Sequence, residues 1–179
     1  MILTLDASPW GLGGYLVVNG QHIAWFACSL TQDDVDVLDI ELGSSTVQQA
    51  AEALAMLVAL KLWLPYWRTA SVSLKVRSDS VSALILLMHL KTSGKATNII
   101  AREVALVLSE GTFMPSVYSH VPGVKNTIAD CLSRRFSPDS QFVLPVELLN
   151  AREDKPPRRV SAWWKSLYPP ASQLVERGL

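Results

Sequence analysis

The dipeptide Asn19-Gly20, which stands between two apolar runs, constrains the fold of this chain more than any other feature of its sequence. Both central residues of a tight type I′ hairpin turn need a positive φ, which asparagine and glycine tolerate best. We therefore expect the flanking runs, GYLVV and HIAWFACSL, to pair as antiparallel strands. The short alternating segment ILTLDAS before them adds a third strand, so the sequence predicts a sheet that opens with three consecutive strands.

A long helix is predicted after these strands. Residues 45–64 are rich in Ala, Leu, Gln and Met, which favour helix, and Pro65 ends the run. This helix is apolar nearly all round, so we expect it to be packed on more than one side. The acidic stretch before it, residues 31–45, holds no sustained period and is predicted to be a loop.

Strands and helices alternate in the second half of the chain. SVSLKVRS and PSVYSHV alternate as strands do, whereas SDSVSALILLMHLK, residues 97–109 and NTIADCLSR favour helix, with caps at Ser78 or Ser80 and at Asn126. The order β-β-β-α-β-α-α-β-α predicts an α/β fold. Its five-stranded mixed sheet would contain three antiparallel N-terminal strands and two parallel strands, flanked by helices.

The composition changes after residue 135. Six of the ten prolines lie in this part of the chain, which holds only one short helical candidate, residues 146–152. We therefore expect a domain over residues 1–135 and a Pro-rich extension or linker over residues 136–179. Trp163 and Trp164 follow two arginines and could contact nucleic acid, but we expect them to pack the extension against a surface.

Charge and cysteine content exclude several classes of protein. Sixteen basic and sixteen acidic residues give no net charge, so any affinity of the isolated chain for nucleic acid should be weak. No apolar run is long enough to span a bilayer and the N-terminus lacks a secretory signal, which predicts an intracellular protein, cytoplasmic or nuclear, without a membrane partner. Cys28 and Cys131 lack the neighbours of a zinc site and are expected to be free thiols.

Four carboxylates occupy informative places in this pattern. Asp6 lies near the end of the first strand, Glu52 within the long helix, Asp79 where a strand meets its helix, and Asp130 on the last helix. Three of them stand among apolar residues, in LTLDAS, AAEALAML and TIADCL, where an unpaired carboxylate would be costly to bury. No cluster of lysines or arginines matches them, which indicates a hard divalent cation as the partner.

Each of these residues also has a simpler interpretation. Asp6 could cap a turn, Glu52 could lie on a solvated helix face, and Asp79 could cap a helix. Asp130 could pair with Arg134 one turn further along the helix. A single shared site explains all four positions together.

Residues 2–135 resemble the ribonuclease H domain of reverse-transcribing mobile elements, especially long-terminal-repeat (gypsy-like) and DIRS-like retroelements. The resemblance rests on DAS after the first strand, Glu in an Ala/Leu-rich helix, SDS after a later strand, and HVPGVKNTIADCLSR with its N-x-x-A-D-x-L-S-R ending. It implies a ribonuclease H-like fold within a reverse transcriptase polyprotein. The implied activity is metal-dependent endonucleolytic hydrolysis of the RNA strand of RNA–DNA hybrids, leaving 5′-phosphate and 3′-hydroxyl ends.

The resemblance also implies roles for individual residues. Asp6 would bridge two Mg²⁺ ions, with Mn²⁺ as a substitute, and Glu52 and Asp79 would complete the ion at the leaving oxygen. Asp130 would hold the ion that activates the attacking water. The resemblance further suggests supporting or substrate-backbone contacts for Ser8, Asn126 and Ser133.

Two departures from this family affect the expected activity. The loop PGVK before the last helix lacks the histidine that many ribonucleases H carry there, and His120 belongs to the preceding strand. There is no dense basic, Trp-containing insertion either, so a polymerase domain of the same polyprotein is the expected second partner besides the hybrid. The remaining candidates for phosphate contacts are scattered cations, Lys91, Lys95, Arg102 and Lys125.

Two alternatives to a nuclease that cuts hybrids are left open by the sequence. They are a catalytically silent module of the same fold and a DNA-cutting relative on that fold.

Overall fold

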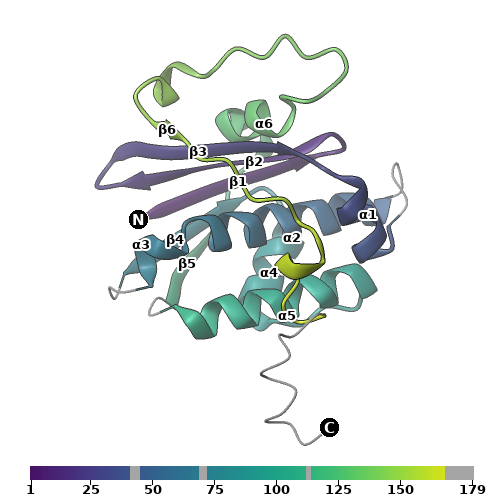
Figure 1. The fold of residues 1–179 in the computed structure, drawn as a ribbon. Helices are drawn as coiled ribbons and strands as arrows, with labels where there is room; N and C mark the ends of the chain where they lie inside the picture. The colour runs from purple at the N-terminus through teal and green to yellow at the C-terminus, as the bar shows by residue number, and fades with distance from the viewer. Residues whose placement is uncertain (41–44, 69–71, 112–113, 168–179) are drawn as a thin grey trace, which may run out of the picture.

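A six-stranded mixed sheet forms the centre of the protein (Figure 1). The computed structural model describes residues 1–40, 45–68, 72–111 and 114–167. The strand order is β5-β4-β1-β2-β3-β6. The strands are β1 (Ile2–Ser8), β2 (Gly11–Val18), β3 (Gln21–Ser29), β4 (Ser73–Ser78), β5 (Met114–His120) and β6 (Arg152–Glu153).

The directions of the strands confirm the fold class that the sequence predicts. β1, β2 and β3 pair antiparallel, and β4 and β5 continue the sheet in parallel with β1. Asn19 and Gly20 form the turn between β2 and β3 with φ values of 51° and 82°, as a type I′ turn requires. The sixth strand, β6, was not predicted; it extends the sheet beyond β3 by two residues that lie beside Ala24 and Trp25.

Helices cover both faces of the sheet (Figure 1). α2, α4 and α5 pack below it in this view, and α6 packs on the opposite face across β1, β2 and β3. As predicted, α2 is buried nearly all round. The helices are α1 (Gln32–Leu38), α2 (Ser45–Leu62), α3 (Leu64–Trp67), α4 (Val81–His89), α5 (Lys95–Glu110) and α6 (Thr127–Ser133), with 3-10 turns η1 (Gly123–Lys125), η2 (Val146–Leu148) and η3 (Ser161–Trp163). Within the described ranges, no helix is long and apolar enough to cross a bilayer.

Two local predictions are wrong. The stretch expected to be a loop contains α1, which begins with a capping box: the Thr31 hydroxyl accepts from the Asp34 amide, and the Asp34 carboxylate accepts from the Thr31 amide. Residues 41–44 of that stretch lie outside the described residues. The helix expected over residues 146–152 is only the turn η2 followed by β6, because Leu148 is buried against Trp25 and the next residues pair with β3.

Residues 154–167, which we call the strap, run from β6 to the side of the sheet that α2, α4 and α5 cover (Figure 1). The Arg159 guanidinium binds the buried Asp34 carboxylate of α1 through two hydrogen bonds. Trp164 is fully buried in the main core, and Lys61 of α2 lies over the ring of Trp163. Both tryptophans therefore pack against the domain, as expected; residues 168–179 of the extension lie outside the described residues.

Candidate active site

Three carboxylates converge where β1 and β4 separate. The two parallel strands pair only as far as Thr4 and Arg77, and Asp6 and Asp79 each lie two residues beyond that last pair. α2 crosses below β1 and supplies Glu52. One carboxylate oxygen from each of the three residues lies within 4.8 Å of the other two. The structure thus brings together three of the four acids that the sequence singles out.

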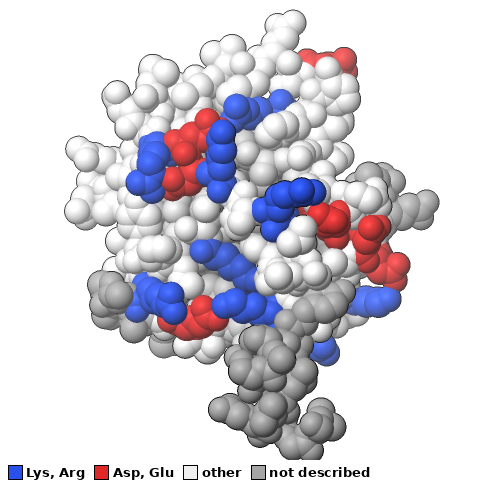
Figure 2. Space-filling view, in the orientation of Figure 1, with Lys and Arg blue, Asp and Glu red and all other residues white. Residues whose placement is uncertain are grey.

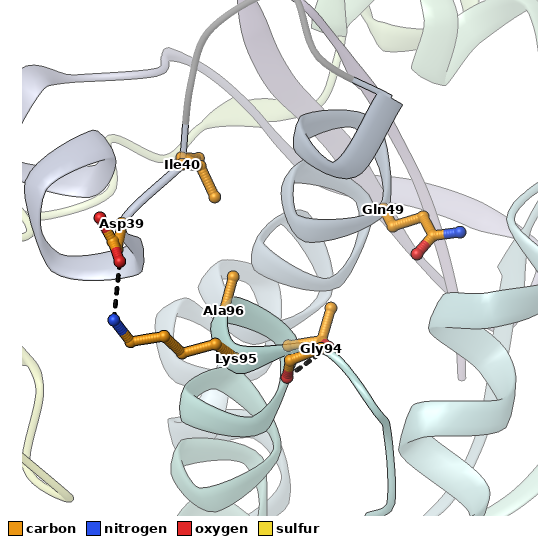
Figure 3. Close-up of a pocket in the computed structure, with 7 residues that line it drawn as sticks. Asp39, Ile40, Gln49, Gly94, Lys95 and Ala96 are labelled. Carbon is orange, nitrogen blue, oxygen red and sulfur yellow. Dashed lines mark hydrogen bonds and ion pairs between the residues drawn. The ribbon is translucent and has the colours of Figure 1, made fainter.

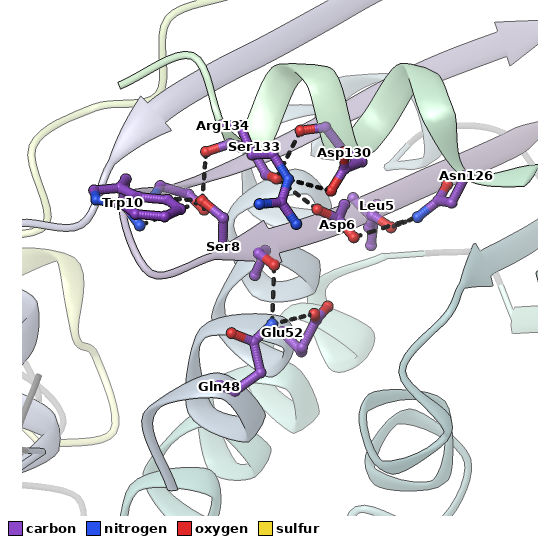
Figure 4. Close-up of polar contacts among 12 residues, drawn as sticks. Leu5, Asp6, Ser8, Trp10, Gln48, Glu52, Asn126, Asp130, Ser133 and Arg134 are labelled. Atoms are coloured by element: carbon purple, nitrogen blue, oxygen red, sulfur yellow. Dashed lines mark hydrogen bonds and ion pairs between the residues drawn. The ribbon is translucent and has the colours of Figure 1, made fainter. Parts of the chain in front are cut away.

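Neutral side chains hold two of these carboxylates in place (Figure 4). The Ser133 hydroxyl of α6 donates to Asp6 Oδ2 at 2.5 Å. The Gln48 amide, one turn before Glu52 on α2, donates to Glu52 Oε1 at 2.8 Å and to the Ala7 carbonyl at 2.9 Å. Sequence reasoning missed Gln48, although its i, i+4 spacing from Glu52 was available as a signal.

Two carboxylate oxygens of the site have no partner. Asp6 and Glu52 are only 4% and 7% exposed. Among the described residues, Glu52 Oε2 and Asp79 Oδ1 are buried without any hydrogen bond. Leaving a buried acceptor unsatisfied costs roughly 1–3 kcal/mol, and more for a charged group. These unpaired oxygens fit a cation that the chain itself does not supply.

The pKa values reflect the same shortage of positive charge. The pKa of Asp6 is raised to about 7: burial is the largest cause, the charges of Asp79 and Asp130 add to it, and the Ser133 hydrogen bond opposes it. Burial, with the charges of Asp6 and Asp79, raises the pKa of Glu52 to about 8. Carboxylate oxygens are the ligands that hard divalent cations prefer, so the three residues fit Mg²⁺ or Mn²⁺.

The three candidate supporting residues lie around Asp6 and are buried. Asn126 occupies the first position before α6, but its side chain makes no capping bond; its amide donates to the Leu5 carbonyl at 3.0 Å and approaches Asp6 Oδ1 at 3.5 Å. The Ser8 hydroxyl donates to the Ser133 carbonyl at 2.7 Å. These contacts attach the last helix to the first strand at the point where Asp6 lies.

Gly13 of β2 allows α6 to lie directly on the sheet. A Cβ atom at Gly13 would lie 2.5 Å from the Ser133 nitrogen and 2.6 Å from Leu132 Cβ. A larger residue would push α6 away and separate Ser133 from Asp6.

Three solved structures are similar in fold to this chain. Ribonuclease H1 from the halophilic archaeon Halobacterium salinarum matches with a TM-score of 0.58 and 19% identity over 78% of this chain and 98% of its own. LC11-RNase H1 in complex with an RNA/DNA hybrid matches with a TM-score of 0.55 and 20% identity over 73% and 91%. LC11-RNase H1 isolated from compost by a metagenomic approach matches at 0.53 and 19% over 75% and 93%. No protein-family model and no curated protein sequence matches the chain.

The chain has the ribonuclease H-like fold. At this identity the likeness concerns the fold, and the chemistry of the chain depends on its own residues.

Asp130 lies at the edge of the cluster formed by Asp6, Glu52 and Asp79. Its carboxylate is half-exposed and accepts a 2.5 Å hydrogen bond from Arg134 Nε, as the simpler interpretation expects (Figure 4). It is not one of the three carboxylates that meet within 4.8 Å, yet its charge contributes to the raised pKa of Asp6. Asp79 does not cap α4; the Ser80 hydroxyl does so by accepting from the Ala83 amide.

The candidate phosphate-binding cations belong to different parts of the fold: Lys91 follows α4, Lys95 and Arg102 lie on α5, and Lys125 lies in η1. Lys95 lines a hollow of about 210 Å³ between α1, α2 and α5, where it pairs with the exposed Asp39 at 2.6 Å (Figure 3). Lys91, Arg102 and Lys125 are exposed. On the described part of the face in Figure 2, basic and acidic side chains are interspersed, in keeping with the zero net charge.

Proposed function

We propose that this chain is a metal-dependent endonuclease that hydrolyses the RNA strand of RNA–DNA hybrids. The observation that carries this proposal is the convergence of Asp6, Glu52 and Asp79, which leaves two buried carboxylate oxygens without a partner. The fold supports it, since the similar structures are of ribonucleases H1 and one of them holds an RNA/DNA hybrid.

The proposed ligands divide into an inner set and a rim. Asp6, Glu52 and Asp79 would hold one Mg²⁺ or Mn²⁺ ion, while Asp6 and Asp130 would hold a second. Two such ions, when bound, activate a water and stabilise the leaving oxygen of an in-line displacement, which gives 5′-phosphate and 3′-hydroxyl ends. The exposed pair of Asp130 Oδ1 with Arg134 is a contact of the kind that contributes about 0.3–0.5 kcal/mol, so it would oppose binding of this ion only weakly.

Residues around the acids would fix the geometry of the ligands. Ser133 and Gln48 each donate to one carboxylate oxygen and so orient Asp6 and Glu52. Hydrogen-bonded supports of this kind usually change metal affinity or activity by about 10- to 100-fold. Their neutral donors leave the negative charge of the site available to a cation.

The affinity of this chain alone for the hybrid should be weak. Its net charge is zero, whereas affinity for a duplex comes largely from neutralised phosphates. We propose that a polymerase domain of the same retroelement polyprotein supplies the missing affinity during reverse transcription. Discrimination of RNA from DNA would depend on contacts to 2′-hydroxyl groups in the minor groove.

A silent module of the same fold is the second candidate. The observation in its favour is the Asp130–Arg134 pair, which occupies the rim carboxylate in the present geometry. This candidate predicts no cleavage of any nucleic acid.

Cleavage of an end-labelled RNA–DNA hybrid in Mg²⁺ or Mn²⁺ tests the proposal. We expect the intact chain to cut the RNA strand and Asp79→Asn, which keeps the shape of the ligand but removes its charge, to lose at least about 100-fold in rate. Asp139→Asn, an exposed acid outside the site, is the matched control and should cut normally.

A panel of RNA duplex, DNA duplex and branched DNA completes this experiment. Cleavage of a DNA substrate in preference to the hybrid would identify a DNA-cutting relative. Failure of the intact chain to cut any member of the panel, at high protein concentration and low salt, would support the silent module.

A further inference from the structure

Two exposed aromatic side chains flank a hollow next to the cluster of Asp6, Glu52 and Asp79, which we call the acidic site. Trp10, in the turn between β1 and β2, is 37% exposed, and Phe136, three residues after α6, is 44% exposed. Together with Leu30 and Val35 they line a hollow of about 290 Å³, which we call the aromatic hollow. The other five tryptophans, all within the described ranges, are buried or only partly exposed, so Trp10 is an exception in this chain.

The turn that carries Trp10 is fixed to the acidic site. The Ser8 hydroxyl accepts from the Trp10 amide at 3.3 Å and donates to the Ser133 carbonyl at 2.7 Å, and the Ser133 hydroxyl in turn donates to Asp6 (Figure 4). On the other side, the Leu30 amide donates to the Trp10 carbonyl at 3.3 Å. The turn at Trp10 is thus linked to Asp6 through Ser8 and Ser133.

Phe136 is held against the same turn. A Cβ atom added to Gly11 would lie 3.3 Å from Phe136 Cδ2 and 3.1 Å from the Ser133 carbonyl oxygen. The Arg135 guanidinium lies 5.7 Å from the Phe136 ring, close enough for a cation–π contact. Both aromatic walls of the hollow therefore have a fixed place relative to the proposed cleavage site.

We propose that the aromatic hollow binds an unpaired nucleobase of the substrate, beside the duplex that the acidic site cuts. This inference rests on the proposed function. Paired bases inside a duplex are stacked on one another, whereas unpaired bases readily stack on aromatic side chains. A volume of about 290 Å³ lies at the lower end of ligand pockets and suits a single base better than a larger group.

Base stacking would also contribute affinity that does not depend on positive charge. The protein has no net charge, and the candidate cations described above lie on different elements. Base stacking on an aromatic ring contributes affinity without neutralising phosphates. The aromatic hollow would therefore direct the chain to hybrids that end in, or adjoin, a single-stranded segment.

The inference is tested by hybrid binding to the uncleaving Asp79→Asn chain, measured by fluorescence anisotropy in Mg²⁺. The probes are a blunt hybrid, hybrids with a short overhang on the RNA or on the DNA strand, and the same overhangs built from abasic nucleotides. Abasic overhangs keep the phosphates and lack the stacking faces. We expect at least one hybrid with a base-bearing overhang to bind about fivefold or more tightly than its abasic counterpart. The overhang that gives this gain shows whether the bound base belongs to the RNA or to the DNA strand.

A second set of variants assigns the gain to the hollow. Trp10→Ala should abolish the gain from the overhang and leave binding of the blunt hybrid unchanged, while Trp10→Phe should retain most of it. Leu149→Ala removes an exposed apolar side chain elsewhere and should change nothing. Acrylamide quenching gives an independent readout, because Trp10 is the most exposed tryptophan and should become protected only by a base-bearing overhang.

Equal binding of base-bearing and abasic overhangs would overturn the inference, as would an equal loss for all probes in Trp10→Ala. Cleavage by the intact chain without any overhang preference would leave the proposed function standing and remove the aromatic hollow from it. An overhang preference in a chain that never cuts would instead retain the hollow and remove the nuclease.

Discussion

Two regions of this protein bury acidic side chains, and they treat the charge differently. Asp34, on α1, is fully buried, and both of its oxygens accept from Arg159 of the strap at 2.6 Å. Glu103 of α5 is fully buried as well, with Lys61 Nζ and the Ser166 amide as its donors. In these places the fold supplies a complete set of partners from the chain itself.

The acidic site receives no such partner. Hydroxyl and amide donors contact Asp6 and Glu52, but none of the described lysines or arginines pairs with either residue or with Asp79. An uncompensated buried charge is strongly destabilising, and this chain avoids one at the strap. The chain thus supplies no cation to the acidic site, which is suited to a cation from solution.

The largest expected effect breaks the buried pair of Asp34 and Arg159, which we call the complete cluster. Arg159→Met keeps most of the side-chain volume but leaves Asp34 buried without its cation, so we expect the free energy of unfolding to fall by about 3–5 kcal/mol. Urea unfolding measures this loss. Arg158→Met, at the exposed neighbouring position, is the matched control. Equal stability of the two variants would mean that the pair of Arg159 and Asp34 contributes nothing to the free energy of unfolding, and that its charges are not compensated differently from those of the acidic site.

The next effect is a dependence of stability on pH, which has its origin in the acidic site. Asp6 and Glu52 have folded pKa values raised to about 7 and about 8, so each holds its proton more tightly in the folded state. Their contribution to stability is therefore full below about pH 4 and is lost as the pH rises through about 7 and 8. Without divalent metal, we expect the free energy of unfolding to fall between pH 5 and pH 9.

Thermal unfolding in EDTA across this pH range checks the sign. Glu52→Gln should flatten the profile, because it removes one of the two titrating carboxyls, whereas Glu147→Gln, at an exposed position, should leave it unchanged. Added Mg²⁺ should restore stability at high pH, since the cation binds the deprotonated form. Stability of the metal-free chain that rises with pH would show that the site is already compensated.

The smallest of the three effects concerns the support of Asp6. Ser133→Ala removes the hydroxyl that donates to Asp6 Oδ2, so we expect Mg²⁺ affinity to weaken by about tenfold with the fold retained. Ser137→Ala, a partly exposed serine after the same helix, is the control. Calorimetric titration of both variants measures the change, and unchanged affinity in Ser133→Ala would leave the hydroxyl with a packing role alone.

Local sequence patterns predicted most of the sheet but not its last strand. Asn19-Gly20 fixes a turn by its own backbone preferences, and the composition of α2 favours helix without help from the rest of the chain. In contrast, β6 exists because Arg152 and Glu153 lie beside β3, a contact across more than a hundred residues. α1 was missed because its seven residues are too few to show a helical period, although its capping box was visible.

The candidate site shows the same division. Asp6 and Glu52 could be found because each stands in an apolar stretch, and Asp79 because it lies where a strand meets its helix. The complete cluster could not be found, since Arg159 and Asp34 lie 125 residues apart and nothing local links them. The placement of Asp130 beside Arg134, rather than within the cluster, depends on side-chain geometry that spacing does not determine.

Calorimetric titration of the metal-free chain with Mg²⁺ near pH 7, in two buffers of different ionisation enthalpy, tests the central claim most directly. We predict binding with release of protons, because carboxyls with raised pKa values must lose them to the cation, and we predict its loss in Asp79→Asn but not in Asp139→Asn. Absence of binding by Mg²⁺ and Mn²⁺, or equal binding by Asp79→Asn, would contradict the claim that the acidic site is suited to a cation from solution.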